Sequence, residues 1–314
     1  MVQLSVQIEG AQGLTWPIWQ RLVRDVEALG FTGLYCCDHF ANPAPPDYDS
    51  LEVMTAMTWA ASNSQRIELG TLVCPVSWRD PVMLARQAMA VDDLSGGRFV
   101  LGIGAGWNQR EHTMFGYPLG EIPERMDRLT EATEIITRLI RNDTPQTVAG
   151  RFFHLHEATL LPRPQRHTRV MIGGSGPKRT FPLVARYADV WNAGGSVEEL
   201  RERNAALDGL IASAGRTPRD VKRTMMKAII CGRNDAEYEA RLRGPRRNPA
   251  NADVSTPELL ARARPRWIIG TPQEVAAQIR AFGDAGVEEI MAQFLVVDDF
   301  EGIRLLGEEV LPLL

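Results

Sequence analysis

The segment LSVQIEGAQGLTWPIWQRLVRDVEALGFTGLYCCDHF (residues 4–40) contains the unit from which the chain is built. The short run LSVQI is followed by a stretch in which Leu22, Val26 and Leu29 recur at helical spacing, and this stretch stops at a glycine. A second apolar run, GLYCC, comes next and ends in an acid and an imidazole. The segment therefore predicts a strand–helix–strand unit whose two strands are parallel.

The same unit recurs along the chain. Asp80 and Pro81, for example, suit the N-cap and the first position of the third helix. The eight strand-like runs are LSVQI, GLYCCD, ELGTLV, FVLGIG, VMIGG, VWNAG, RTMMKAIICG and EIMAQFLV. Eight such pairs predict an α/β fold, a (β/α)₈ TIM barrel that forms one domain over residues 1–314, with insertions after the fourth and seventh strands. An open doubly wound sheet is the alternative.

Composition restricts the class of protein. With 314 residues and a net charge of -4, the chain has the character of a soluble globular protein and lacks the basic surface of a nucleic-acid binder. The first residues do not resemble a secretion signal, and no apolar run reaches the roughly 20 residues of a membrane span. We therefore expect a cytoplasmic protein. Its four cysteines lack CxxC spacing, which predicts reduced, packed thiols and no metal site.

The first candidate for catalysis is the pair that ends the second run, Asp38 and His39. Barrel enzymes build their active sites at the carboxyl ends of the strands, so both side chains are expected at the mouth. Histidine is suited to proton transfer near neutral pH, and an adjacent carboxylate could raise its pKa or fix its orientation. The alternative is that His39 only forms a hydrogen bond with the next loop.

Other strand ends add apolar and hydrogen-bonding groups, a mixture that suits a flat aromatic ligand. The GIGAGW run lacks the third glycine of a dinucleotide-binding GxGxxG motif, so its glycines more simply allow backbone to approach a ligand. These strand-end residues are Gln7, Glu9, Leu72, Val73, Cys74, Gly104, Gly106, Trp107, Asn108 and Asn192.

A phosphate site is predicted at Gly173, Gly174, Ser175 and Gly176, where a strand passes through a glycine turn into a helix. The first turn of that helix carries Lys178 and Arg179, and cations at a helix N-terminus oppose the helix dipole. An anion bound to the free backbone N–H groups, with Arg179 closing over it, would resolve the conflict. The alternative is a solvated turn beside an exposed basic helix.

Several longer stretches together resemble the luciferase-like monooxygenase superfamily, and within it the oxidoreductases that depend on the deazaflavin coenzyme F420. The resemblance covers nearly the whole chain. The stretches that resemble the family are DHF (38–40), LGTLVCPVSWRDPVMLARQ (69–87), LSGGRFVLGIGAGWNQREHTMFGYP (94–118), ERMDRLTEATEII (124–136), IGGSGPKRT (172–180), ARYADVWNAG (185–194) and IIGTPQEVAAQI (268–279).

The resemblance implies a barrel that binds a flavin or deazaflavin at its mouth. It assigns Asp38 and His39 to the catalytic site and places a non-proline cis peptide at Leu72–Val73. It also implies cofactor contacts for Leu72, Val73, Cys74, Gly104, Gly106, Trp107 and Asn108, with residues 173–176 as the phosphate loop. The implied activity is hydride transfer between F420 and a small organic substrate; the alternatives are an FMN-dependent monooxygenase and, after it, a noncatalytic flavin-binding protein. A homodimer is an option that composition does not establish.

The chain departs from the family's sugar-phosphate dehydrogenases in two places. Trp107 stands where those enzymes carry a catalytic glutamate, and the aromatic residue that follows their Asp-His pair is missing after Phe40. We therefore do not expect a sugar phosphate as substrate.

An arginine-rich segment, at about 232–266, precedes the last strand and is expected to be irregular. One hypothesis is a mobile lid whose positive charge attracts an anionic cofactor tail or substrate. The alternative is an exposed surface balanced by Asp235, Glu237 and Glu239. The arginines are Arg241, Arg243, Arg246, Arg247, Arg262, Arg264 and Arg266.

Overall fold

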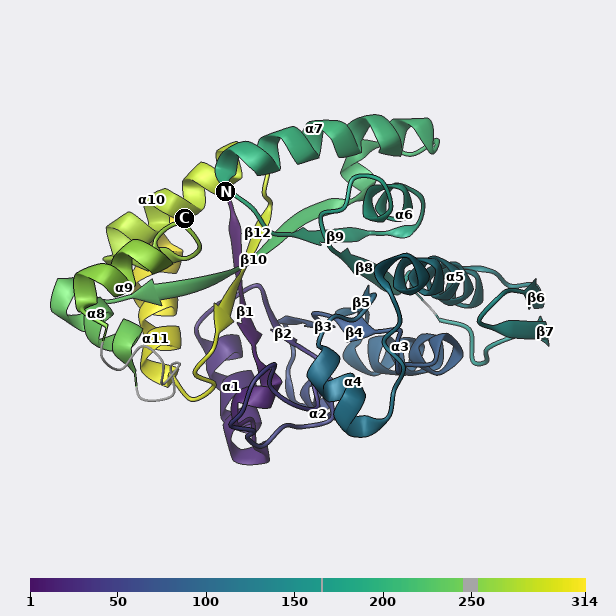
Figure 1. Ribbon diagram of the computed structural model, residues 1–314, viewed down its shortest axis with the longest axis horizontal. Helices are drawn as coiled ribbons and strands as arrows, with labels where there is room; N and C mark the ends of the chain where they lie inside the picture. Colours follow the sequence, from purple (N-terminus) through teal and green to yellow (C-terminus); the bar gives the residue numbers. More distant parts are fainter. Residues whose placement is uncertain (165, 245–253) are drawn as a thin grey trace.

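Eight parallel strands form a closed ring in the computed structural model, which describes residues 1–164, 166–244 and 254–314 (Figure 1). Strand β10 pairs with both β9 and β12, which closes the ring. The predicted (β/α)₈ barrel is confirmed, and the open-sheet alternative is wrong. The ring strands are β1 (Gln3–Ile8), β2 (Gly33–Cys36), β3 (Glu68–Thr71), β5 (Phe99–Gly104), β8 (Arg169–Gly173), β9 (Val190–Ala193), β10 (Lys222–Cys231) and β12 (Glu289–Phe294).

Helices surround the ring and bury their apolar stripes against it (Figure 1). In α1, for example, Leu22 and Val26 are fully buried, as their spacing predicts. The ring helices are α1 (Trp16–Ala28), α2 (Val53–Asn63), α3 (Pro81–Ser95), α5 (Ile122–Arg141), α6 (Thr180–Tyr187), α7 (Val197–Ser213), α10 (Pro272–Asp284) and α11 (Phe300–Leu305).

The amino end of the ring is occupied by ion pairs. Arg169 and the Tyr35 hydroxyl both contact Glu68, and the Lys222 Nζ lies 2.6 Å from the Glu289 Oε2. Apart from Tyr35, these residues open strands β3, β8, β10 and β12. Above them an apolar layer that includes Val100, Met171 and Met291 fills the interior. A ligand that reaches the inside of the ring would therefore enter from the carboxyl ends of the strands.

The insertions contain more regular structure than the sequence predicted. After β5 come α4 (Gln109–Phe115) and then α5; an antiparallel hairpin, β6 (Gln146–Ala149) and β7 (His154–Ala158), follows α5. After β10 come α8 (Asp235–Arg243), α9 (Thr256–Ala263) and β11 (Ile268–Gly270), which pairs with β10. The hairpin and the α8–α9 segment project from opposite sides of the barrel (Figure 1).

The expectation of an irregular segment at 232–266 is wrong for its described part. Its helices of nine and eight residues are too short to give a clear periodicity in sequence. They are held by a small core of their own, in which Tyr238 and Leu242 of α8 pack with Leu259 of α9 and Ile269 of β11.

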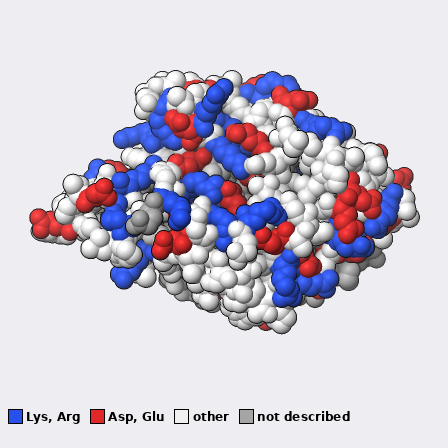
Figure 2. Space-filling view, turned by 180° about the vertical axis from the view of Figure 1, so that it is seen from behind, with Lys and Arg blue, Asp and Glu red and all other residues white. Residues whose placement is uncertain are grey.

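Local carboxylates pair with arginines of this segment. Arg241 contacts Asp299 at 2.5 Å, and Arg262 contacts Glu258 at 2.5 Å. These contacts favour the balanced-surface alternative for those two arginines, whereas Arg246 and Arg247 lie outside the described residues. On the face drawn in Figure 2, basic side chains alternate with acidic ones.

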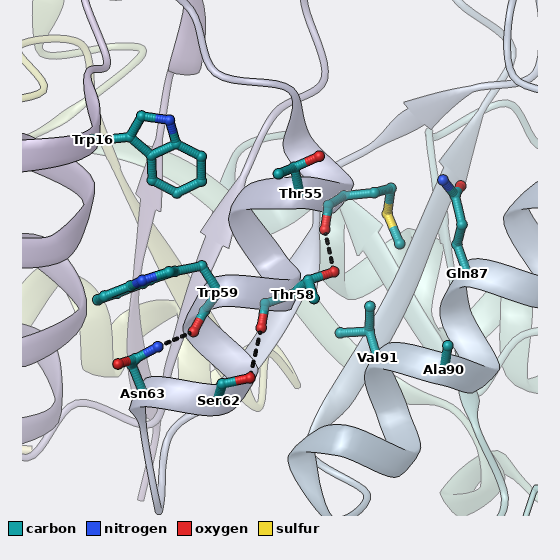
Figure 3. Close-up of a pocket in the computed structure, with 10 residues that line it drawn as sticks. Trp16, Thr55, Thr58, Trp59, Ser62, Asn63, Gln87, Ala90 and Val91 are labelled. Carbon is teal, nitrogen blue, oxygen red and sulfur yellow. Dashed lines mark hydrogen bonds between the residues drawn. The ribbon is translucent and has the colours of Figure 1, made fainter.

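A groove lies on the outer surface of the barrel between α2 and α3 (Figure 3). The side chains of Thr58, Ser62 and Asn63 hydrogen-bond to carbonyls of their own helix, so their polar groups are already satisfied. Trp59 and Trp16 are therefore large apolar side chains that line the groove.

That the protein forms a homodimer stays a prediction.

Two further observations concern the whole chain. All four cysteines are buried free thiols, as predicted. No helix in the described ranges combines the length and apolarity that crossing a membrane requires.

The N-cap of α3 gives a first testable prediction. The Asp80 carboxylate accepts hydrogen bonds from the backbone N–H groups of Val82 and Met83 at 2.9 and 3.0 Å. Asp80→Ala should lower the free energy of unfolding by about 1 kcal/mol, measured by urea denaturation. Asp93→Ala is the matched control, because this exposed carboxylate lies near the other end of the same helix. An equal loss of stability in both variants would contradict the assignment.

Candidate active site

The strand ends predicted to form the site meet at one rim of the barrel. The side chain of Val73 lies between two glycines there. A Cβ added to Gly104 would be 2.6 Å from one Val73 methyl, and a Cβ added to Gly173 would be 3.3 Å from the other. The Leu72–Val73 peptide is cis, as the resemblance implied. The structure thus brings together the ends of β3, β5 and β8.

The loop after β5 requires glycine at position 106. Gly106 has a φ of +79°, and a Cβ there would lie 2.5 Å from the Ser77 Oγ. Trp107 follows with 60% of its surface exposed, whereas Asn108 is buried and donates to the Ala41 carbonyl at 3.0 Å. Cys74 is fully buried beside Ile103. Trp107 is therefore available to a ligand, while Asn108 fastens this loop to the loop after β2.

His39 is held by a carboxylate that the sequence did not single out. Its Nδ1 lies 2.9 Å from the Oε1 of Glu111, and the Phe40 backbone N–H donates to the other oxygen at 3.1 Å. The Glu111 side chain is completely buried, whereas 18% of the His39 side chain is exposed. Glu111 comes from α4, 72 residues further along the chain. His39 and Glu111 come together only because α4 packs over the loop after β2.

The pKa of His39 reflects two opposing effects. Burial of the ring acts to lower the pKa, because it disfavours the charged form. The hydrogen bond and the negative charge of Glu111 raise it, with further contributions from Glu9 and Asp38, and the net result is a pKa above the ordinary histidine value. With Nδ1 engaged by Glu111, Nε2 is the ring nitrogen left for proton exchange with a ligand.

Asp38 does not hold the His39 ring. Its carboxylate forms two hydrogen bonds of 2.7 Å with Arg79, which also contacts Glu52 at 2.7 Å. Successive side chains of an extended backbone point to opposite sides, so Asp38 and His39 face different partners. Of the two effects expected from the adjacent carboxylate, Asp38 raises the pKa of His39 through its charge, whereas the orientation of the ring is held by Glu111 and not by Asp38.

One aromatic ring contacts His39, and others pack the following residue against α4. The rings of His39 and Trp107 make an edge contact with centroids 5.6 Å apart. Phe40 packs against Phe115 of α4, with centroids 4.6 Å apart. His112 of the same helix bonds the Ser77 Oγ at 2.8 Å, which fixes α4 to the loop after β3.

The glycine turn after β8 has free backbone donors. The Gly174 N–H donates to the Asn192 carbonyl at 3.0 Å, and the Trp191 indole donates to the Gly174 carbonyl at 2.7 Å. In the described part of the chain, the amides of Ser175 and Gly176 donate to no acceptor. The helix α6 begins at Thr180, so Lys178 and Arg179 lie in the turn before it and not, as predicted, in its first turn. The two free amides precede this turn and suit an anionic oxygen.

Arg179 is placed differently from the expectation. It forms an ion pair with Asp127 of α5, and 47% of its side chain is exposed. Its predicted closure over a bound anion stays a prediction. Among the residues that the structure describes, no three His, Cys, Asp or Glu side chains are grouped to hold a metal ion.

Comparison with known proteins identifies the family. Residues 7–289 match the model of the luciferase-like monooxygenase family. The chain is 29% identical over 308 residues to an F420-dependent glucose-6-phosphate dehydrogenase of Microbacterium testaceum (strain StLB037), a match that covers 91% of this chain and 90% of the relative. It is 26% identical to a pyrimidine monooxygenase of Allorhizobium ampelinum (strain ATCC BAA-846 / DSM 112012 / S4), over 86% of this chain and 81% of the relative.

Solved structures share the fold. An F420-dependent secondary alcohol dehydrogenase, solved with an F420-acetone adduct, superposes with a TM-score of 0.85 at 19% identity, over 100% of this chain and 99% of that one. The EDTA monooxygenase of Chelativorans sp. BNC1 superposes with a TM-score of 0.81 at 17% identity, over 99% and 92% of the two chains. Sequence match, fold and rim geometry agree, and the chain belongs to the luciferase-like monooxygenase family of oxidoreductases.

Proposed function

We propose that this protein is an F420-dependent oxidoreductase that transfers a hydride between the deazaflavin and a small organic substrate, with His39 exchanging the accompanying proton. The observation that carries the proposal is the His39–Glu111 pair on the same rim as a glycine turn with free amides. The similarity to F420-dependent dehydrogenases over 91% of the chain supports this choice of cofactor.

The residues present suit such a cofactor. Gly104 and Gly173 leave room for the Val73 side chain at this rim, where a Cβ at either position would crowd it. Leu72, Val73, Gly104, Gly106 and Trp107 are proposed to hold the ring system and its arm, and residues 173–176 the phosphate. Cys74 and Asn108, predicted as cofactor contacts, are buried and are proposed to support this rim from behind. When bound, the deazaflavin supplies the carbon that accepts or donates the hydride.

Each rim residue has a distinct proposed role. Glu111 fixes the His39 ring through Nδ1 and stabilises its protonated form, which leaves Nε2 to hold or release a proton. Asp38 keeps Arg79 in place beneath the rim. Trp107, with its large exposed surface, excludes water from one side of the site.

A second candidate is an FMN-dependent monooxygenase. The pyrimidine and EDTA monooxygenases among the similar proteins favour it, and a phosphate turn serves FMN equally well. The two candidates differ in cofactor and in the use of oxygen, so cofactor binding separates them.

The substrate is proposed to be a small organic molecule other than a sugar phosphate. The F420-dependent relatives act on glucose-6-phosphate. In this chain Trp107 occupies the place of their catalytic glutamate, and an exposed indole offers an apolar surface instead of a carboxylate.

Cofactor identity is tested by titrating the purified protein with F420 and, separately, with FMN, while the visible absorption spectrum is followed. F420 should give a saturable spectral change at lower concentration than FMN. Tighter binding of FMN, together with oxygen consumption in the presence of a reductant, would support the monooxygenase instead.

The glycine turn is tested with cofactors that lack the phosphate. Because two free amides are available to anionic oxygens, the deazaflavin riboside without its phosphate arm should bind more weakly than F420 by roughly tenfold or more, which corresponds to about 1.4 kcal/mol. Riboflavin against FMN is the parallel comparison. Equal affinities within both pairs of compounds would show that the turn does not bind the phosphate.

The His39–Glu111 pair predicts a pH effect. Glu111→Gln removes the negative charge that raises the pKa of His39, so this pKa should fall and the ring should lose its proton at lower pH than in the wild type. NMR titration of the imidazole resonances measures the change. Glu121→Gln, at an exposed residue just before α5, is the control. An unchanged pKa in Glu111→Gln would contradict the pairing.

A further inference from the structure

Three polar side chains at the carboxyl ends of β1 and β12 have no ligand assigned to them in the function proposed above. They are Gln7, Glu9 and Gln293, called here the Glu9 cluster. Gln7 and Gln293 are register partners in neighbouring parallel strands, so their side chains lie on the same face of the sheet. Glu9 directly follows β1 and is partly exposed.

Both glutamine side chains of the Glu9 cluster donate to the same oxygen of the Glu9 carboxylate. Gln293 Nε2 donates to Glu9 Oε1 at 2.7 Å, and Gln7 Nε2 donates to the same oxygen at 3.3 Å. Both amides use Oε1, and the Cys37 thiol is a third partner of this carboxylate. A carboxylate has about four acceptor sites, so Glu9 retains capacity for another donor. Gln7 is completely buried, yet its Oε1 has no hydrogen-bond partner in the described part of the chain. Such an orphaned acceptor is unfavourable unless a donor reaches it.

The Glu9 cluster lies beside the catalytic rim. The backbone N–H of Gly10, the residue after Glu9, donates to the Cys37 Sγ at 3.1 Å, and Cys37 is two residues before His39. The negative charge of Glu9 also acts on the His39 ring. Glu9 and His39 therefore lie near one another at the same rim.

The charge of Glu9 is not neutralised by a cation. Asp38 pairs with Arg79, and Glu111 pairs with His39. No Lys, Arg or His in the described ranges forms an ion pair with Glu9, whose side-chain hydrogen-bond partners are two neutral amides and the Cys37 thiol. A partly exposed carboxylate of this kind attracts hydrogen-bond donors and cations and repels anions.

We propose that the Glu9 cluster is a substrate-recognition site for a hydrogen-bond donor, a hydroxyl or a protonated amine, on the molecule that contacts His39. The inference rests on the proposed function, because it names the class of substrate that the same rim accepts. Glu9 is a specificity-determining residue here, and anionic substrates such as carboxylates and phosphate esters are disfavoured.

The test compares four probes that share a cyclohexyl body: cyclohexanol, cyclohexylammonium, methoxycyclohexane and cyclohexanecarboxylate. Binding to the full protein is measured by saturation-transfer NMR, without cofactor and with F420 or FMN, whichever binds. Cyclohexylammonium and cyclohexanol should bind at least tenfold more tightly than the ether and the carboxylate. This ranking requires no variant, so it stands even if a substituted protein fails to fold.

Two variants test whether Glu9 causes the preference for hydrogen-bond donor probes. Glu9→Gln should weaken cyclohexylammonium binding tenfold or more, measured without cofactor, and remove the preference for this probe over the carboxylate. Glu202→Gln, which removes an exposed carboxylate on α7, should change nothing. Equal binding of carboxylate and ammonium, no saturable binding of either donor probe, or an unaltered preference in Glu9→Gln would overturn the inference. Failure of both cofactors to bind would instead overturn the proposed function, because probe binding is also measured without them.

Discussion

The parallel direction of eight strands in a closed ring is the constraint on which the rest of the structure depends. Parallel strands bring all of their carboxyl ends to one rim, so loops that are far apart in the sequence share a small region. The other end of the ring is occupied by the contacts of Glu68 with Tyr35 and Arg169 and by the pair of Lys222 with Glu289. Chemistry at the inside of the ring is thereby confined to one side.

Within that rim, the short helix α4 determines the state of the catalytic imidazole. It brings a completely buried carboxylate, Glu111, to His39, and it is anchored by His112 to Ser77. A buried carboxylate with a single histidine partner favours the protonated imidazole, which opposes the effect of burial on the ring. The proposed proton exchange at His39 thus depends on a helix inserted after β5, outside the regular strand–helix repeat.

The two proposed recognition sites of the rim act on different parts of its ligands. The glycine turn at 173–176 offers backbone amides, which suit an anionic group. Such amides do not distinguish the phosphate of F420 from the phosphate of FMN. The Glu9 cluster on the opposite arc of strands, β1 and β12, offers acceptors instead. An arrangement with donors on one arc and acceptors on another is consistent with an anionic cofactor and a neutral or cationic substrate sharing the mouth.

The sequence by itself determined the strand–helix repeat, the parallel direction of the strands and the N-cap at Asp80, because each depends on local periodicity or backbone conformation. The tertiary structure decided that the strands close into a ring, since closure depends on the pairing of β10 with both β9 and β12. His39, Val73 and the turn at 173–176 could be predicted as rim residues because each directly follows a strand or lies in a strand-end loop. Only the tertiary structure decided which carboxylate serves His39, since Glu111 is 72 residues away and approaches through the packing of α4. The tertiary structure also decided the partner of Arg179, which is Asp127 of a different helix. The same is true of α8 and α9, because their short apolar faces are buried only by packing against β10 and β11. Contacts between distant segments depend on how the elements pack, and no local pattern encodes that.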